Sequence, residues 1–415
     1  MKEVQSPATN TFIAPSALTL SDLLDQYVTI YGVNTWAPST YEGHKSLIDN
    51  YIRPLIGDKK LDDINPQMMD HFYKQLKTVK AKARPYGMAN DGFITPRTIR
   101  EIHKLLRNAF NQAVKWELMA RNPVQNATLP KCEEHEREIW DAETLFKAID
   151  LCDDDTLRLA MHLSFACSLR QGELLGLTWD CIDISPESIE SVYIDKELQR
   201  VSRDALNQTE EHGVKLKFPS ILACRHTVLV LKEPKTKTSV RKVFLPRAVA
   251  EMLVERKKEI NELKELLGNE YTDYNLVFAS TSGTPIEGAT ISRLFNKLIS
   301  DNDLPRVVFH SIRHTSITYK LMLSGGDIKG VQGDTGHAQA SMVTERYAHI
   351  LDDNRRMNAE RFQQQFYSGP VVEEPAAQPD PLQQLDAGEK QTLLIKLLAE
   401  SPEMAAMIKT MAQAM

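Results

Sequence analysis

Residues 310–350 read HSIRHTSITYKLMLSGGDIKGVQGDTGHAQASMVTERYAHI. This stretch contains a His-x-x-Arg-His cluster that begins with His310 and includes Arg313, and a Gly-His pair that ends with His337. Tyr347 follows ten positions later. Histidine exchanges protons near neutral pH, arginine binds phosphate oxygens through two N–H groups, and a tyrosine oxygen can act as a nucleophile. The stretch therefore indicates phosphoryl transfer through a covalent phosphotyrosine, with no bound metal required.

Two basic residues upstream extend this set. Arg170 lies in SLRQGELLGL, at the end of an apolar helix, where Glu173 can hold its guanidinium toward a phosphate. Lys237 lies in the turn between two predicted strands, and a lysine at a hairpin tip can reach a DNA minor groove and protonate a leaving oxygen. Lys235 is an alternative for that role. Each residue alone also has an ordinary explanation: a surface ion pair, a solvent-exposed lysine, or a packed histidine or tyrosine.

The composition is that of a globular protein with more than one domain. The chain has 415 residues, of which 42% are hydrophobic and 26% charged, and its net charge is −6. The acidity is concentrated at the end, because residues 368–415 hold seven Asp and Glu against three Lys. Residues 18–130 hold 15 Lys and Arg against 11 Asp and Glu, so the first part of the chain is basic, although the net charge of the whole chain argues against a nucleic-acid partner.

Several functional classes find no support in the sequence. The five cysteines are scattered, without the spacing of metal ligands, and we interpret them as reduced thiols of a cytoplasmic protein. The N-terminus lacks an apolar signal core, and no apolar run reaches transmembrane length. No Gly-rich phosphate loop or His-Glu-x-x-His motif is present, so we expect no ATP, metal or other cofactor.

Residues 17–130 are predicted to form a helical domain after a flexible lead-in over residues 1–16. A polar and Gly-rich loop is predicted over residues 80–95. The predicted helix starts are Thr19, a capping box from Ser39 to Glu42, Asn65-Pro66, and Thr95-Pro96, the last of which opens a helix to about Asn122.

Residues 131–139, KCEEHEREI, are predicted to link this domain to a second one over residues 140–367. Residues 200–226 are interpreted as a polar, irregular insertion. Predicted helices span residues 142–151, 155–167, 173–177, 247–267, 287–300, 311–323 and 341–347, and predicted strands span 189–198, 227–231 and 240–245. The expected fold is mainly α with a small antiparallel β-sheet.

The last segment, residues 368–415, is predicted to be an acidic, Pro-rich linker followed by an amphipathic helix from Gln391.

The order Arg-x-x-Glu, turn Lys, His-x-x-Arg-His, Gly-His and Tyr resembles that of the tyrosine recombinase (phage integrase) family, particularly integrases of phages and conjugative transposons. The resemblance covers residues 18 to about 350. It is carried by LLRNAFNQAVKWELMARNPVQNATLPK (105–131), SLRQGELLGLTWDCID (168–183), PKTKTSVRKVFLP (234–246), LVFASTSGTPI (276–286) and the 310–350 stretch.

This resemblance implies a helical core-type DNA-binding domain and a mixed α/β catalytic domain. It implies Tyr347 as the nucleophile, Arg170 and Arg313 as the clamp on the scissile phosphate, and Lys237 as the general acid. It also implies that His310 and His337 position the reacting groups and transfer protons. His314 is interpreted as structural. The implied partners are double-stranded DNA, a homotetramer on paired sites, and accessory directionality or DNA-bending proteins, with no membrane.

Three departures from the family pattern are visible. Ser311 stands where an Asp is frequent, and Asp334-Thr335 precede Gly336 where leucines are common. An additional N-terminal domain for accessory DNA sites, which many relatives carry, is expected to be absent or truncated.

The implied function is an integrase that cuts and rejoins duplex DNA through a 3′-phosphotyrosine and integrates or excises a mobile element. The alternatives are a type IB topoisomerase-like enzyme and a catalytically inactive DNA-binding protein.

Overall fold

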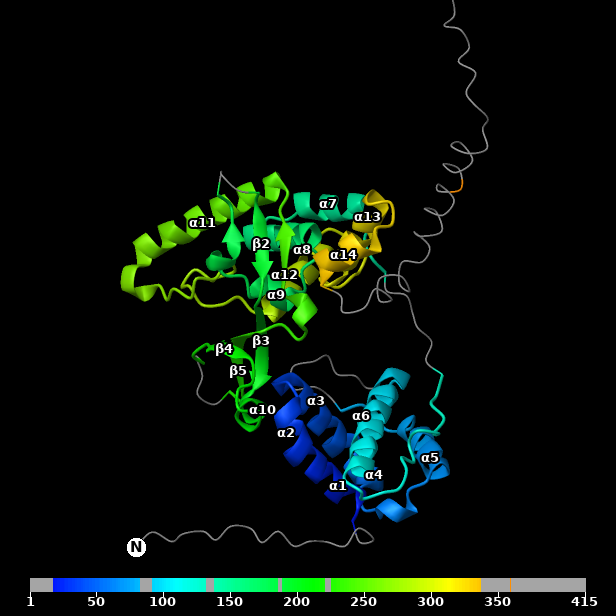
Figure 1. The fold of residues 1–415 in the computed structure, drawn as a ribbon. Helices are drawn as coiled ribbons and strands as arrows, with labels where there is room; N and C mark the ends of the chain where they lie inside the picture. The colour runs from blue at the N-terminus through cyan, green and yellow to red at the C-terminus, as the bar shows by residue number, and fades with distance from the viewer. Residues whose placement is uncertain are drawn as a thin grey trace, which may run out of the picture. The chain divides into compact units, whose positions relative to one another are not determined.

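The computed structural model describes residues 18–82, 92–131, 138–185, 189–220, 225–336 and 359 (Figure 1). By its internal contacts the chain divides into two units, residues 1–350 and 351–415, and all described residues except Ala359 belong to the first. The predicted lead-in, the helix at 341–347 and the tail over 368–415 lie outside the described residues. None of the helices in the described ranges is both long and apolar enough to cross a membrane.

The N-terminal part is helical (Figure 1). Thr19 accepts a hydrogen bond from the amide of Asp22 and caps the first helix, while the Asp22 carboxylate accepts one from the amide of Thr19. The elements are α1 (Leu20–Gln26), η2 (Tyr27–Gly32), α2 (Val33–Thr35), α3 (Pro38–Leu47), η3 (Ile48–Ile52), α4 (Arg53–Ile56), η4 (Leu61–Asp63), α5 (Pro66–Leu76) and α6 (Pro96–Lys115).

Two of the helix limits predicted for this part of the chain were wrong, and farther along the chain the helix predicted over residues 173–177 spans Gln171–Leu175. The helix predicted to begin with a Ser39–Glu42 capping box begins at Pro38, because proline at the first helical position has no N–H that needs an acceptor. The helix that begins at Pro96 ends at Lys115 rather than near Asn122, and Glu117 beyond it adopts a left-handed backbone with φ of 59°. Asn65 and Thr95 cap α5 and α6 as predicted.

These helices enclose their own hydrophobic core. The side chains of Leu24, Ile52, Phe72 and Phe110 are at most 2% exposed within it. Burying such a side chain stabilises a fold by about 1.5–3 kcal/mol. One member of this core, Ala205, comes from the later part of the chain.

A second hydrophobic core is formed by residues 140 to 312. Asp141 and Asp154 cap its first two helices through their side-chain oxygens, as the sequence pattern at Asp141 predicted. Helix α8 lies within this core and buries most of its apolar side chains. The helical elements are α7 (Ala142–Asp150), α8 (Asp155–Ala166), α9 (Gln171–Leu175), η5 (Trp179–Cys181), α11 (Arg247–Leu267), η7 (Gly268–Glu270), α12 (Gly288–Asp301), α13 (Ser311–Leu323) and α14 (Ile328–Thr335).

Two three-stranded antiparallel sheets replace the one predicted (Figure 1). The first has the order β1 (Ile182–Asp183), β2 (Ser191–Ile194), β6 (Arg241–Phe244), with Val192 opposite Val243. The second has the order β3 (Glu197–Ser202), β5 (Thr227–Lys232), β4 (Val214–Lys217). The strand predicted over residues 189–198 is therefore two strands, separated at Asp195 and Lys196.

The segment predicted as an irregular insertion contains regular secondary structure. Within residues 200–226, β3 continues to Ser202, and α10 (Arg203–Gln208) and β4 follow. In the break between β2 and β3, the ammonium group of Lys196 contacts Asp195 at 3.0 Å and Asp180 at 3.1 Å. The sequence did not predict β3 as a separate strand, because β3 is stabilised by pairing with β5 rather than by a local sequence pattern.

Candidate active site

Arg170 lies at the start of α9, where the chain leaves α8 through a sharp turn. Ser168 in this turn has a positive φ of 51°, and Arg170 itself is extended and occupies the N-cap position. The carboxylate of Glu173 accepts a hydrogen bond from the Arg170 amide at 2.9 Å and one from its Nη1 at 2.6 Å. The partner predicted for Arg170 is thus confirmed, and the arginine side chain stays 34% exposed.

Glu173 is the centre of an arginine cluster, which we define as Arg170, Glu173, Arg241 and Arg313. The Glu173 side chain is 1% exposed, and its Oε2 lies 3.0 Å from Nη2 of Arg241 and 3.9 Å from Nη1 of Arg313. Burial alone would raise the pKa of Glu173, but the charge and hydrogen bond of Arg241, with help from Arg170, hold it below its ordinary value. Three guanidinium groups therefore surround one ionised carboxylate.

Arg313 lies inside the protein at the first turn of α13. Its side chain is 2% exposed, its Nη1 donates to the carbonyl oxygen of Ser168, and its Nη2 donates to that of Thr335 at 2.7 Å. The guanidinium thus joins the turn before α9 to the end of α14. Of the three arginines in the cluster, Arg170 is the one that solvent reaches most readily.

Arg241 is the member of the cluster that sequence reasoning missed. It begins β6, its side chain is 5% exposed, and its guanidinium donates to Glu173, to the Ser239 carbonyl at 2.9 Å and to the Asp334 carbonyl at 2.6 Å. One signal was present in the sequence: Arg241 occupies the same face of its strand as the buried Val243. A charge on the inward face of a strand requires buried partners.

Lys237 is exposed and begins the short 3₁₀ helix η6 (Lys237–Ser239). The strands on either side, β5 and β6, belong to different sheets, so the predicted hairpin tip is a connection between sheets. Ser239 in the same turn accepts a hydrogen bond from Nη1 of Arg170 at 3.3 Å, which places this turn at the arginine cluster. Lys235, the alternative, is close enough to His44 of α3 to contribute to lowering the pKa of that histidine, after the larger effect of burial. The assignment of the general acid to Lys237, with Lys235 as the alternative, stays a prediction.

His310 and His314 lie at the start of α13, one helical turn apart. Their ring centroids are 5.2 Å apart and the rings meet edge to face at 89°. Both rings are partly exposed, whereas Ser311 between them is buried and donates to the Val308 carbonyl at 2.7 Å. The serine that replaces the frequent Asp therefore stabilises the start of the helix.

Gly336 ends α14 in a left-handed conformation, with φ of 63° and ψ of 37°. A Cβ atom at this position would lie 2.9 Å from the Thr238 carbonyl oxygen and 3.0 Å from Nη1 of Arg241. Only glycine lets the end of α14 approach the Lys237 turn so closely. Two predicted residues that follow, His337 and Tyr347, lie outside the described residues.

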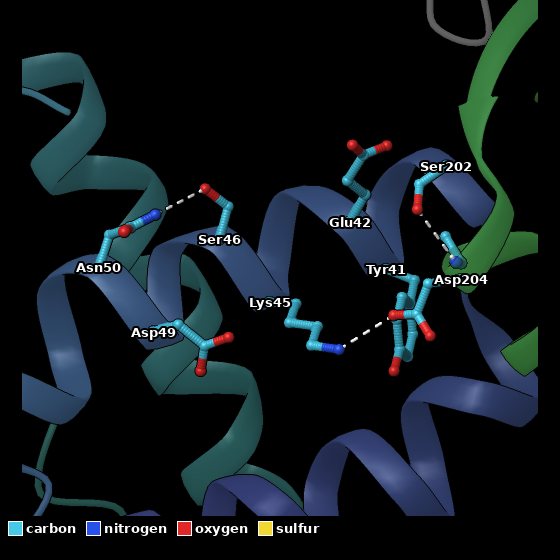
Figure 2. Close-up of a pocket in the computed structure, with 9 residues that line it drawn as sticks. Tyr41, Glu42, Lys45, Ser46, Asp49, Asn50, Ser202 and Asp204 are labelled. Atoms are coloured by element: carbon cyan, nitrogen blue, oxygen red, sulfur yellow. Dashed lines mark hydrogen bonds and ion pairs between the residues drawn. The ribbon is translucent and has the colours of Figure 1, made fainter. Parts of the chain in front are cut away.

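A cavity of about 340 Å³ lies away from this cluster, between α3 and the start of α10 (Figure 2). Lys45 contacts Asp204 there at 3.0 Å, and Asn50 donates to Ser46 at 3.1 Å. The cavity contains none of the predicted site residues, and its one lysine, Lys45, already pairs with Asp204. We therefore assign the candidate active site to the arginine cluster and the Lys237 turn. In the part of the chain that the structure describes, no three His, Cys, Asp or Glu side chains gather as metal ligands.

Known proteins resemble this chain in sequence. Residues 212–354 match the phage integrase family, and residues 19–77 match the N-terminal SAM-like domain of phage integrases. A tyrosine recombinase XerC-like protein of Caldanaerobacter subterraneus is 25% identical over 343 residues, which are 80% of each chain. The ICEBs1 integrase of Bacillus subtilis is 22% identical and covers 78% of this chain and 77% of its own.

Solved structures show the same fold. The Tn1549 transposon integrase, in complex with a circular intermediate DNA, superposes with a TM-score of 0.64 at 18% identity and covers 83% of this chain and 99% of its own. A lambda integrase tetramer bound to a Holliday junction gives a TM-score of 0.52 at 20% identity and covers 83% and 81%. The fold is that of integrases. In sequence, residues 212–354 and 19–77 match two parts of the phage integrase family, and the relatives that resemble the chain include tyrosine recombinases and integrases of conjugative elements.

Proposed function

We propose that this chain is a site-specific DNA recombinase that integrates and excises a mobile element. The observation that carries the proposal is the arginine cluster, in which three guanidinium groups share one buried carboxylate and Arg170 is open to solvent. The phosphate oxygens of a DNA backbone gain negative charge in the transition state of phosphoryl transfer. Fixed donors aimed at such charge are worth about 3–4 kcal/mol each.

In the proposed reaction the oxygen of Tyr347 forms a bond to phosphorus while the bond from phosphorus to the 5′ oxygen breaks. The products are a 3′-phosphotyrosyl link and a strand that ends in a 5′-hydroxyl. Lys237 gives a proton to the departing 5′ oxygen, and the phenol proton passes to His310 or His337. Attack by the 5′-hydroxyl of another strand reverses these steps, so the joining needs no ATP and no metal.

In this proposal the guanidinium of Arg170 contacts the scissile phosphate directly. The buried guanidinium of Arg313 stabilises the same phosphate through its positive charge. Residues 17–130 and 140–367 act as two domains that hold duplex DNA in the cytoplasm. Exposed lysines and arginines of the first domain contact phosphates, so DNA affinity falls as salt rises. Two cuts on each of two duplexes require four protomers, and a lambda integrase has been solved as a tetramer on a Holliday junction. Accessory proteins that bend DNA or set direction would act on this assembly.

Formation of a covalent DNA adduct tests the nucleophile. The DNA that flanks the gene is cloned, the cut is mapped, and a duplex with a nick beside that cut is incubated with the protein and separated on a denaturing gel. Wild-type protein is expected to give an adduct, and Tyr347→Phe is expected to give none while its DNA affinity stays within about twofold, because the phenol oxygen supplies chemistry rather than binding. An adduct formed by Tyr347→Phe would rule out the assignment.

A plasmid that carries two copies of the mapped site separates recombination from the related topoisomerase reaction. A recombinase yields deletion or inversion products with exchanged flanks. Relaxed plasmid without such products would contradict the proposed function, because it indicates that one strand swivels and is resealed without exchange.

A further inference from the structure

Arg241 is a charged side chain that the proposed reaction does not use, although it lies at the centre of the site. Its three hydrogen bonds reach three separate segments: Glu173 of α9, Ser239 of η6 and Asp334 of α14. Two of its acceptors are backbone carbonyls, so the guanidinium fixes the course of the main chain as well as one side chain. A planar guanidinium donates in fixed directions, which an ammonium group does not do.

The bond to Ser239 acts on the turn that carries Lys237. Lys237, Thr238 and Ser239 form the single 3₁₀ turn η6, and the Lys237 carbonyl accepts from the amide of Val240 at 3.2 Å. The Ser239 side chain accepts from Arg170 at 3.3 Å, while its carbonyl accepts from Arg241 at 2.9 Å. The Lys237 side chain itself is exposed. The position of Lys237 is therefore set by the turn. The turn is held in its place by the hydrogen bonds that Ser239 accepts from Arg170 and Arg241.

We propose that Arg241 is a positioning residue, which holds the Lys237 turn against Glu173 and the end of α14 so that the lysine faces the leaving 5′ oxygen. This inference rests on the proposed function. The Arg241 side chain is 5% exposed and its guanidinium donates to Glu173 and to two backbone carbonyls, so we assign it to holding the Lys237 turn rather than to contacting the phosphate. A displacement of about 1 Å in a catalytic group costs about 100-fold in rate.

The chemistry of the leaving group separates this role from a general loss of structure. An alkoxide is a strong base and needs a proton as it leaves, whereas a thiolate is a much weaker base and leaves without one. DNA in which sulfur replaces the bridging 5′ oxygen at the mapped cut therefore bypasses the general acid. A variant in which only the position of Lys237 is disturbed should therefore cleave this DNA at close to the wild-type rate. A variant that binds the phosphate poorly should cleave it slowly.

The experiment measures single-turnover cleavage of oxygen and sulfur DNA by the full-length protein. Arg241→Met is expected to cleave the oxygen DNA about 100-fold more slowly than wild type and the sulfur DNA within about tenfold of wild type. Lys237→Met should show the same pattern, and Arg170→Met should be slow on both DNAs. Arg241→Lys, which keeps the charge but not the planar fork, should recover only part of the lost rate.

Arg256 provides a matched control, because it donates to the backbone carbonyls of Val277 at 3.3 Å and Ala279 at 2.9 Å and pairs with Glu259 at 3.0 Å, outside the cluster. Arg256→Met should cleave both DNAs near the wild-type rate. Thermal unfolding is recorded for each variant, and if Arg241→Met does not fold, the same comparison is made with Arg241→Lys.

The outcomes separate the two proposals. An Arg241 variant that is folded but equally slow on both DNAs would overturn the positioning role, provided that Lys237→Met is rescued by sulfur. A Lys237→Met variant that sulfur does not rescue would overturn the assignment of the general acid and with it this inference. Wild-type protein that cuts neither DNA would overturn the proposed function itself.

Discussion

At the scale of single residues, the site depends on a buried carboxylate that keeps three arginines together. Glu173 is 1% exposed and contacts Arg170, Arg241 and Arg313. Removing one partner from a buried ion pair is strongly destabilising, because the remaining charges are left in a dry environment without compensation. The carboxylate therefore supports the fold as well as the direction in which Arg170 points.

We expect Glu173→Gln to lower the free energy of unfolding at neutral pH by about 3–5 kcal/mol. The pKa of Glu173 in the folded protein lies below its ordinary value of 4.5, so its stabilising contribution is complete above about pH 4.5 and is lost as the pH falls through the lower folded-state value. Unfolding midpoints measured from neutral pH into acid should converge for wild type and variant. A constant difference down to low pH would contradict this account.

Gly336 gives a second prediction at this scale. Gly336→Ala should be destabilised by the left-handed backbone, which costs about 1–2 kcal/mol, and further by the contact with the Thr238 carbonyl at 2.9 Å. Gly325→Ala is the matched control, because its φ is also 63° but its added Cβ would meet nothing within 4 Å. Chemical denaturation should show the larger loss for Gly336→Ala, and single-turnover assays should show slower cleavage for this variant only. Equal effects of the two substitutions would contradict the close approach.

At the scale of elements, α9 is held against β3 by glycines. A Cβ atom at Gly176 would lie 2.8 Å from the amide nitrogen of Leu198 and 2.9 Å from the Cα of Glu197. The helix that carries Glu173 and positions Arg170 therefore packs directly on the backbone of the second sheet. Arg200 of β3 forms an ion pair of 2.5 Å with Glu287 at the start of α12. Strand β3 is therefore connected to α12 as well as to α9.

Gly176→Ala is expected to push α9 away from β3, because the atoms it meets are main-chain atoms that cannot rotate aside. We expect a loss of stability of about 1–3 kcal/mol, the range typical of overpacking, together with slower cleavage. Gly43→Ala in α3 is the control for unfolding, since nothing lies within 4 Å of its added Cβ. Alanine inside a helix is more stable than glycine by about 0.5–1 kcal/mol, so denaturation should show a small gain for Gly43→Ala. A stable, fully active Gly176→Ala would refute the coupling of α9 to β3.

The elements also show what a sequence can and cannot predict. The starts at Thr19, Asn65, Thr95 and Asp141 were predicted correctly because a cap acts over three residues. The division of the predicted strand at Lys196 was missed because pairing with the distant strand β5 decides it, whereas α10 was missed although Ser202 caps it locally by accepting from the Ala205 amide. The strands that pair, β3 and β5, are joined by a segment whose sequence is polar and irregular.

At the scale of the whole molecule, the site is assembled by contacts between distant parts of the chain. Glu173 and Arg241 are 68 positions apart, Arg241 and Asp334 are 93 apart, and Ser168 and Arg313 are 145 apart. Motif order predicted Arg170, Lys237, His310 and Arg313 as site residues because these residue types occur here in the order that the resemblance to tyrosine recombinases implies. It missed Arg241 because nothing in the local sequence indicates which distant carbonyls a buried guanidinium will contact.

The long-range contacts also connect the two hydrophobic cores. Ala205 at the start of α10 packs with the N-terminal core, and Lys45 of α3 contacts Asp204 with both side chains about half exposed. An exposed ion pair contributes at most about 1 kcal/mol, so the packing of Ala205 is the more substantial connection.

The central claim is that Tyr347 becomes joined to the 3′ phosphate of a cut strand. The most direct test is to trap the adduct, digest its DNA with nuclease and its protein with trypsin, and map the attached nucleotide by mass spectrometry. Cleavage after Arg346 and Arg355 yields the peptide YAHILDDNR, which begins with Tyr347. We expect a nucleotide linked through its 3′ phosphate to the tyrosine of this peptide. A nucleotide on any other residue, or one linked through its 5′ phosphate, would contradict it.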